Sequence, residues 1–210
     1  MELALKKEFD DYYDYIFNAN SEIEYIRIRE KKQRATELKQ LRNIGIETVK
    51  LYSVNELLGI LNDNSYVVVY TDAYKHNGQG KKLVPFRVAV NNYNNCLIAP
   101  YYNVSNGFYV KYLQIGQRRF NITMYNGGQI QSGQPYSIKE LNPSYHRLIG
   151  LPIFSIDYIS DNRGNMVAVD FNTVENIGKL GFEKFISAEE IKVEIFNSLI
   201  AYNKLARENR

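Results

Sequence analysis

Two acids and an amide gather within one stretch of this sequence, in a pattern that could hold a metal ion. The runs 153–159 and 166–172 are expected to form antiparallel strands, because Asp161-Asn-Arg-Gly164 between them is typical of a turn. Side chains alternate between the two faces of a strand. One face of this predicted hairpin is apolar and comprises Phe154, Ile156, Tyr158, Val167, Val169 and Phe171. The other face comprises Ser155, Asp157, Ala168, Asp170 and Asn172.

The two carboxylates on the polar face are expected to repel each other. A two-residue turn at Arg163-Gly164 would place Asp157 directly across from Asp170, whereas a bulge would shift this pairing by one position. Opposed like charges destabilise a hairpin by up to roughly 1 kcal/mol, so this arrangement invites a cation. Carboxylate and amide oxygens are hard ligands that suit Mg²⁺ rather than zinc. The alternative is a plain solvated face of an edge hairpin.

Helices and short strands are expected to precede this hairpin. The N-terminal third reads as helical up to residue 45, and residues 35–70 alternate helix, strand, helix and strand. Within that stretch Ser53 and Glu56 form a capping box, and Tyr66 to Tyr70 resembles a buried strand. The further strand candidates are Val84 to Val90, Cys96 to Tyr102, Phe108 to Leu113, Arg119 to Tyr125 and Gln129 to Gln131.

A second capping box, Ser187 with Glu190, opens a long helix at the end of the chain. The sequence therefore predicts an α+β fold with N-terminal helices, a small α/β lobe and a mostly antiparallel sheet carrying a C-terminal helix. The expected segments are 1–45 for the helical part, 46–83 for the small lobe and 84–210 for the sheet lobe.

The hairpin resembles the metal-binding hairpin of the ATP-grasp fold family, in which an acidic residue on one strand is followed by Asp/Glu-x-Asn on the next. Here those residues are Asp157 and Asp170-Phe-Asn172. Upstream, the segment containing Arg119 resembles the strand and turn that carry a phosphate-facing arginine. Tyr66 to Tyr70, followed by Gly78-Gln-Gly80-Lys81, resembles the strand and glycine-rich loop that cover the nucleotide.

The resemblance implies a two-lobe ATP-grasp-like arrangement and an ATP- and Mg²⁺-dependent ligase. Such an enzyme joins a carboxylate substrate to an amine or thiol through an acylphosphate, and two Mg²⁺ ions bridge the nucleotide phosphates. The implied metal ligands are Asp157, Asp170 and Asn172, the implied phosphoryl-clamping residues are Arg119 and Arg87, and the implied ATP-binding residues are Lys75, Gly78, Gly80 and Lys81. Tyr70 stands where the family usually has a nucleotide-binding lysine, so Lys75 or Lys81 would have to substitute.

Two other functions remain open from the sequence. Lys75-His-Asn-Gly78 resembles the nucleophile motif of covalent nucleotidyltransferases such as RNA ligases, in which the lysine takes up a nucleotide. A non-catalytic accessory protein with a degenerate ATP-grasp-like fold could instead bind nucleic acid or another protein through the basic stretch 31–42.

Composition excludes several other classes. No apolar run approaches the ~18 residues of a membrane span, and no secretory signal is recognisable, so a cytoplasmic protein without a membrane partner is expected. One cysteine and two histidines provide neither an internal disulfide nor a zinc site. A net charge of +3 over 210 residues does not by itself indicate a nucleic-acid-binding protein.

Overall fold

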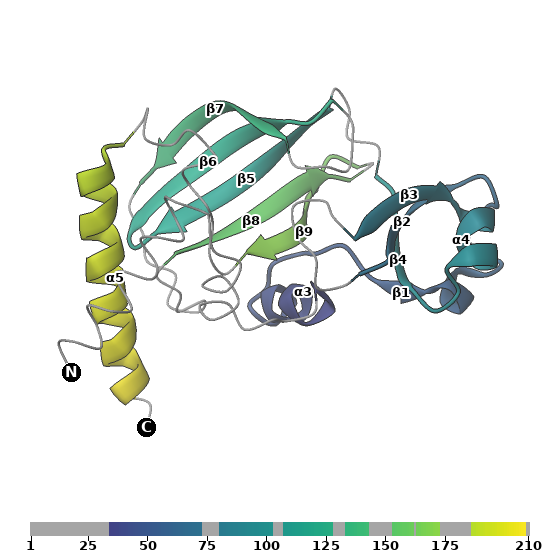
Figure 1. Cartoon of the computed structure of the whole chain (residues 1–210), viewed down its shortest axis with the longest axis horizontal. Helices are drawn as coiled ribbons and strands as arrows, with labels where there is room; N and C mark the ends of the chain where they lie inside the picture. Colours follow the sequence, from purple (N-terminus) through teal and green to yellow (C-terminus); the bar gives the residue numbers. More distant parts are fainter. Residues whose placement is uncertain are drawn as a thin grey trace.

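The computed structural model describes residues 34–72, 80–102, 107–127, 133–142, 153–161, 163–172 and 186–208. Two sheets with antiparallel pairing carry the fold (Figure 1). The small sheet has the order β1 (Tyr52–Ser53), β4 (Leu97–Pro100), β2 (Tyr66–Tyr70) and β3 (Lys81–Pro85). The large sheet has the order β7 (Gln134–Leu141), β6 (Arg118–Tyr125), β5 (Phe108–Ile115), β8 (Ile153–Ser160) and β9 (Met166–Asn172). The predicted α+β class is confirmed.

Four helical elements accompany the sheets in the described residues: α3 (Arg34–Asn43), the 3₁₀ turn η1 (Val54–Leu57), α4 (Phe86–Asn92) and α5 (Ala188–Glu208). None of them is both long and apolar enough to cross a membrane. Most of the predicted N-terminal helical segment lies outside the described residues, and of the basic stretch 31–42 only the part in α3 is described.

The small sheet is covered on one face by η1 and α4. Its core comprises Val54, Leu57, Val67, Val69, Phe86, Ala89 and Ile98. The prediction of a strand over Val84 to Val90 is wrong, because β3 ends at Pro85 and a helix begins at Phe86. The first N–H groups of α4 are satisfied by the turn before β2: Phe86 donates to the Ser65 carbonyl at 2.7 Å and Arg87 to that of Asp63 at 3.0 Å.

Burial of one face stabilises this helix, although its valines have a high β propensity. Phe86 and Ala89, three residues apart, lie on one helical face and are both buried against the sheet. Since β3 and β4 pair with β2, the small sheet extends to Pro100, and the boundary expected after residue 83 falls inside it. The capping box predicted at Ser53 and Glu56 is confirmed, although it opens only the single turn η1.

The large sheet contains the predicted hairpin as its last two strands. β5, β6, β8 and β9 match the strands expected there to within two residues at each end. β7 was not predicted, because its sequence QPYSIKEL is polar and lies at an exposed edge. The short strand expected over Gln129 to Gln131 falls outside the described residues.

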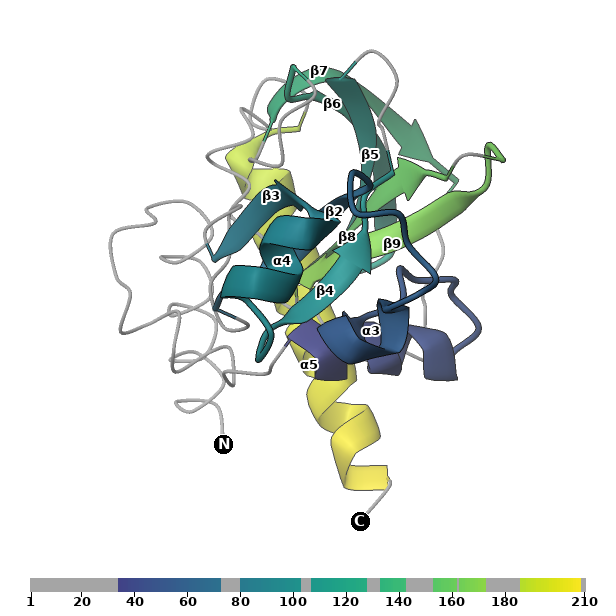
Figure 2. The same ribbon diagram turned by 90° about the vertical axis from the view of Figure 1, so that its right-hand side faces the viewer.

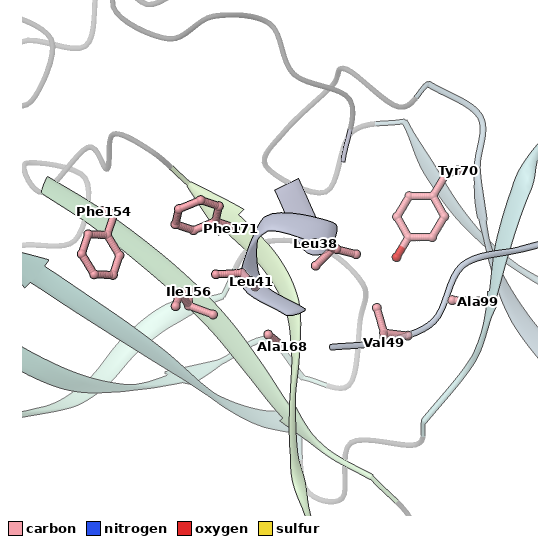
Figure 3. Packing of buried hydrophobic residues seen from close by; sticks show 9 residues of the cluster. All are labelled: Leu38, Leu41, Val49, Tyr70, Ala99, Phe154, Ile156, Ala168 and Phe171. Carbon is pink, nitrogen blue, oxygen red and sulfur yellow. The ribbon is translucent and has the colours of Figure 1, made fainter. Parts of the chain in front are cut away.

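The helix α3 lies close to β9 (Figure 2). A second core joins the two sheets and α3 (Figure 3). It comprises Leu38, Leu41, Val49, Tyr70, Ala99, Phe154, Ile156, Ala168 and Phe171. The stretch from Glu47 to Val49 lies beside β9, where Ala168 donates to the Glu47 carbonyl and Val49 donates to the Ala168 carbonyl, each at 2.9 Å. The strand expected over Glu47 to Tyr52 is thus reduced to this parallel bridge and to β1.

Candidate functional site

The hairpin β8–β9 places Asp157 directly across from Asp170, and Ser155 across from Asn172. The connection is longer than a two-residue turn: Ser160 pairs with Met166, which alone would shift the register by one residue. A bulge in β9, between the pairs made by Asp157 and Tyr158, restores it. The predicted pairing of the two aspartates is therefore confirmed, but by a different route.

The same bulge corrects the assignments of Ala168 and Val167. Val167 was expected on the apolar face, but it pairs with Ile159 and so shares the face of Asp157. Ala168 was expected on the polar face with the aspartates, but it pairs with Tyr158 and is buried in the core shared by the two sheets. The extra residue, Val169, is partly buried against that core. A bulge reverses the face of every residue beyond it, which period-two alternation alone does not reveal.

Lys111 lies beside Asp157 on the neighbouring central strand. Its Cα pairs with that of Asp157 across β5 and β8, and its Nζ lies 2.7 Å from Asp157 Oδ1. The same ammonium donates to Ser155 Oγ at 3.4 Å, and Asn172 Nδ2 donates to that hydroxyl, also at 3.4 Å. The side chain of Lys111 is 6% exposed and that of Asp157 17%. This is a largely buried ion pair in the polar face of the hairpin.

Lys81 reaches the other aspartate from the small sheet. At the first position of β3 it pairs with Tyr70 at the end of β2, immediately after Gly80, which has a φ of 71°. Its Nζ lies 3.9 Å from Asp170 Oδ2 and 5.8 Å from the centre of the Tyr70 ring. Asp170 Oδ1 accepts a hydrogen bond from the Phe171 N–H at 2.9 Å. The four charged side chains therefore form a row in the order Lys111, Asp157, Asp170, Lys81.

Sequence reasoning missed Lys111. The signal was present, because Lys111 is the single charged residue in the otherwise apolar or neutral run 108–115, FYVKYLQI. A charge in the middle of a buried strand needs a partner. What the sequence could not show is which strand lies beside β5, and hence that the partner is Asp157.

Arg119 is not brought together with the carboxylates. It pairs with Gln114 on β5, and Gln114 pairs with Phe154 on β8, so Arg119 lies on the face of the large sheet that carries Phe154. Asp157 lies on the opposite face. The Arg119 guanidinium donates from Nε to the Asn142 carbonyl at 2.8 Å. It also contacts the hydroxyl of Tyr112, whose pKa is raised by burial.

The remaining implied residues are dispersed or lie outside the described chain. Arg87 is exposed on α4. This helix lies on the side of the small sheet away from the large sheet (Figure 1). Lys75 and Gly78 lie outside the described residues. Of the residues expected to bind ATP, the structure thus brings Lys81, together with its neighbour Gly80, to the hairpin.

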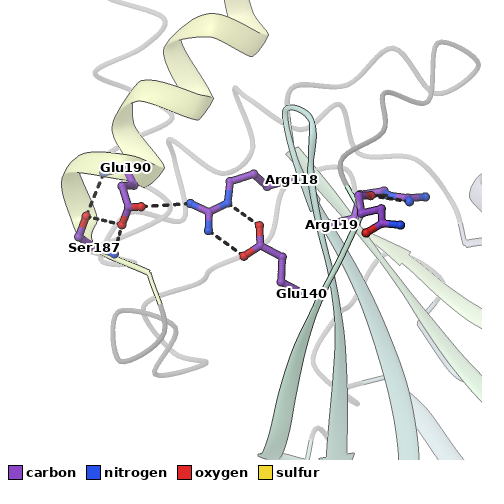
Figure 4. A network of polar contacts seen from close by, with 6 residues as sticks. Arg118, Arg119, Glu140, Ser187 and Glu190 are labelled. Carbon is purple, nitrogen blue, oxygen red and sulfur yellow. Dashed lines mark hydrogen bonds and ion pairs between the residues drawn. The ribbon is translucent and has the colours of Figure 1, made fainter.

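Arg118, next to Arg119, lies on the same face of the large sheet as Asp157, but its guanidinium binds other carboxylates. Its guanidinium binds both oxygens of Glu140 on β7, at 2.7 and 2.9 Å, and lies 3.6 Å from Glu190 at the start of α5 (Figure 4). The hydrogen bond from Arg118 lowers the pKa of Glu140, and the Ser187 hydroxyl lowers that of Glu190. The Ser187–Glu190 capping box is confirmed. This network attaches the first turn of α5 to the sheet.

The donor set of the hairpin fits a magnesium ion. Two carboxylates and an amide provide hard oxygens, although no group of three His, Cys, Asp or Glu side chains converges in the residues described. The two lysines balance the two aspartates, so the row has no formal net charge. It can present carboxylates to a cation and ammonium groups to phosphate at the same place.

Comparisons with known proteins identify the fold. No family model matches the chain, and no curated protein matches its sequence. Among solved structures, D-cycloserine synthetase DcsG matches with a TM-score of 0.57 and 10% identity, over 83% of this chain and 72% of its own. The biotin carboxylase domain of the Hydrogenobacter thermophilus 2-oxoglutarate carboxylase matches with a TM-score of 0.55 and 14% identity, over 83% of this chain and 46% of its own.

Two further ligases match at similar levels. D-alanine–D-alanine ligase from Coxiella burnetii has a TM-score of 0.53 and 13% identity, over 86% of this chain and 60% of its own. PsnB, described as an ATP-grasp ligase, has a TM-score of 0.50 and 14% identity, over 79% of this chain and 58% of its own. Apart from DcsG, these structures are matched over less than two thirds of their own length. The chain has an ATP-grasp fold, as its hairpin indicated.

Proposed function

We propose that this protein binds ATP with Mg²⁺ at the polar face of the β8–β9 hairpin and acts as an ATP-dependent ligase. The observation that carries the proposal is the row formed by Lys111, Asp157, Asp170 and Lys81. It lies where the small sheet approaches the hairpin of an ATP-grasp fold. The reaction would activate a substrate carboxylate as an acylphosphate, which an amine or thiol then attacks.

Each part of the row has a distinct role in this proposal. Asp170 and Asn172 would hold Mg²⁺, which when bound neutralises charge on the phosphates, and Asp157 would add its negative charge beside them while it stays paired with Lys111. Lys81 would bind a phosphate oxygen as a point charge, and it stands in for the lysine that Tyr70 replaces. Gly80, with its positive φ, lets the chain turn into β3. Lys75 and Gly78 remain predictions for the preceding loop, and Arg119 and Arg87 have no assigned role here.

The test is thermal unfolding of the whole chain with ATP, with and without Mg²⁺. A ligand that binds only the folded state at ~10 times its Kd adds about 1.4 kcal/mol of stability, or about 3–6 °C in Tm for a chain of this size. We expect this rise only when Mg²⁺ is present. Asp170→Asn keeps the shape of the side chain but removes its charge, and it should abolish the rise.

Asp63→Asn is the matched control, because it makes the same chemical change at an exposed turn of the small lobe. It should leave the rise intact. If the wild type gains no Mg²⁺-dependent stability from millimolar ATP, the ligase proposal fails and the non-catalytic accessory protein replaces it. If labelled ATP instead leaves an acid-stable nucleotide on Lys75, the nucleotidyltransferase interpretation replaces it.

A further inference from the structure

We infer that Lys111 is a fixed cation of the hairpin site, which limits the site to one Mg²⁺ per nucleotide instead of two. This inference rests on the proposed function and concerns what this particular chain does with the site. Lys111 belongs to the middle of β5, which pairs with β6 on one side and β8 on the other. Its backbone is held by both neighbours, so the ammonium cannot be withdrawn by moving the strand.

The ion pair with Asp157 is expected to persist when ligand binds. The Lys111 side chain is almost fully buried, and its ammonium has Asp157 Oδ1 at 2.7 Å and Ser155 Oγ at 3.4 Å. An ammonium that left these oxygens inside the protein would lose its solvation without gaining water. The cost of an unsolvated ammonium therefore keeps Lys111 beside Asp157.

This contact changes how many divalent cations the hairpin can hold. A metal ion placed on Asp157 would have to share that carboxylate with the ammonium of Lys111. Two positive centres on one carboxylate repel each other strongly in a site that solvent barely screens. Asp170 and Asn172 belong to β9, which pairs with β8 and not with β5, so they are the place for a single Mg²⁺.

Lys81 does not impose the same limit. Its ammonium is 3.9 Å from Asp170 Oδ2, beyond hydrogen-bonding distance, and it lies at the first position of an edge strand. It can turn from Asp170 to a phosphate oxygen when the nucleotide arrives. The two lysines of the row thus differ: Lys111 is held against Asp157 and replaces a metal ion, whereas Lys81 makes a longer contact with Asp170 from the end of a strand and can turn to the phosphates.

The experiment counts metal ions. Mn²⁺ replaces Mg²⁺, a non-hydrolysable ATP analogue saturates the protein, and electron paramagnetic resonance of free Mn²⁺ gives the number bound per nucleotide. We expect one for the wild type. Lys111→Met, which is neutral and of similar length, and Lys111→Gln, which is neutral but can still donate to Asp157, should each raise the count to two. Lys111→Arg retains the charge and should keep it at one.

The outcomes separate this inference from the proposed function. Two Mn²⁺ per nucleotide in the wild type overturn the inference while supporting the nucleotide site. A folded Lys111→Gln or Lys111→Met that still binds one also overturns it, with folding checked by far-ultraviolet circular dichroism. Absence of any Mn²⁺-dependent nucleotide binding in the wild type removes the proposed function and the inference with it.

Discussion

At the scale of single residues, two opposed aspartates are tolerated because each has a lysine beside it. Lys111, on the neighbouring strand, places its Nζ 2.7 Å from Asp157 Oδ1. Lys81, on the other sheet, places its Nζ 3.9 Å from Asp170 Oδ2. The sequence suggested that a bound cation would relieve the repulsion between the aspartates, with a solvated polar face as the alternative. The chain supplies two cations of its own, so the hairpin can form before any metal binds. Removing an aspartate therefore has a cost that the sequence did not indicate.

Asp157→Asn is expected to destabilise the protein by about 2–3 kcal/mol, since breaking a buried pair leaves the buried ammonium of Lys111 without its counter-charge. The value lies below the usual range because the Asp157 side chain retains some exposure and asparagine still accepts a hydrogen bond. Urea unfolding measures it. The double variant Lys111→Met/Asp157→Asn removes both charges and should recover most of the loss. A single variant as stable as the wild type would show that the pair has no structural role.

At the scale of elements, α5 depends on the tight turn between β5 and β6. Gly116 has a φ of 57°, and a Cβ added there would lie 2.6 Å from Glu194 Oε2 and 3.1 Å from the Glu194 carbonyl oxygen. The helix therefore packs directly onto the turn. Ile191 and Ile195 are fully buried on that side of α5, and Arg118 holds its first turn through Glu190. The turn at Gly116 and the ion pair between Arg118 and Glu190 thus attach α5 to the large sheet together.

Gly116→Ala should destabilise the protein by more than backbone strain alone. A non-glycine residue in the left-handed region costs about 1–2 kcal/mol, and forcing α5 away from the turn adds about 1–3 kcal/mol of overpacking. Gly164→Ala is the control, because Gly164 has a φ of 83° with no atom within 4 Å of the added Cβ. It should show the strain alone. Equal losses in urea unfolding would mean that α5 is not packed against Gly116 as described.

At the scale of the whole molecule, the two sheets share a core and should unfold together. The core around α3 takes Tyr70 and Ala99 from the small sheet and Phe154, Ile156 and Phe171 from the large one. The segment from Glu47 to Val49 adds backbone hydrogen bonds to β9 just before the chain enters the small sheet. An opening of one lobe would expose apolar surface of the other. The hairpin site thus lies next to the part of the fold that couples the lobes.

Leu41→Ala, in that shared core, is expected to cost about 3 kcal/mol and to leave unfolding as a single transition. Tyrosine fluorescence and far-ultraviolet circular dichroism should report the same midpoint, because both sheets lose the same core. Ile60→Ala, at a side chain that is 71% exposed, should change stability by less than about 0.5 kcal/mol. Separate midpoints for the two probes in the Leu41 variant would show that the lobes unfold independently.

The sequence by itself determined the features that depend on neighbours along the chain. Alternation in 153–159 and 166–172 predicted the hairpin, and Ser187 with Glu190 predicted the start of α5. Tyr66 to Tyr70 was predicted with its observed bounds. These signals are local, because side-chain period and helix capping are set within a few residues.

Only the tertiary structure decided which strands lie beside one another, and so which charges meet. The position of β5 next to β8 gives Asp157 its lysine, and the bulge in β9 moves Ala168 to the shared core. The register of β6 turns Arg119 to the other face of the sheet. Strand neighbours and bulges are fixed by packing between residues far apart in sequence, and a shift of one residue exchanges the faces of a strand. That is why the site's carboxylates were found from the sequence while Lys111 was not.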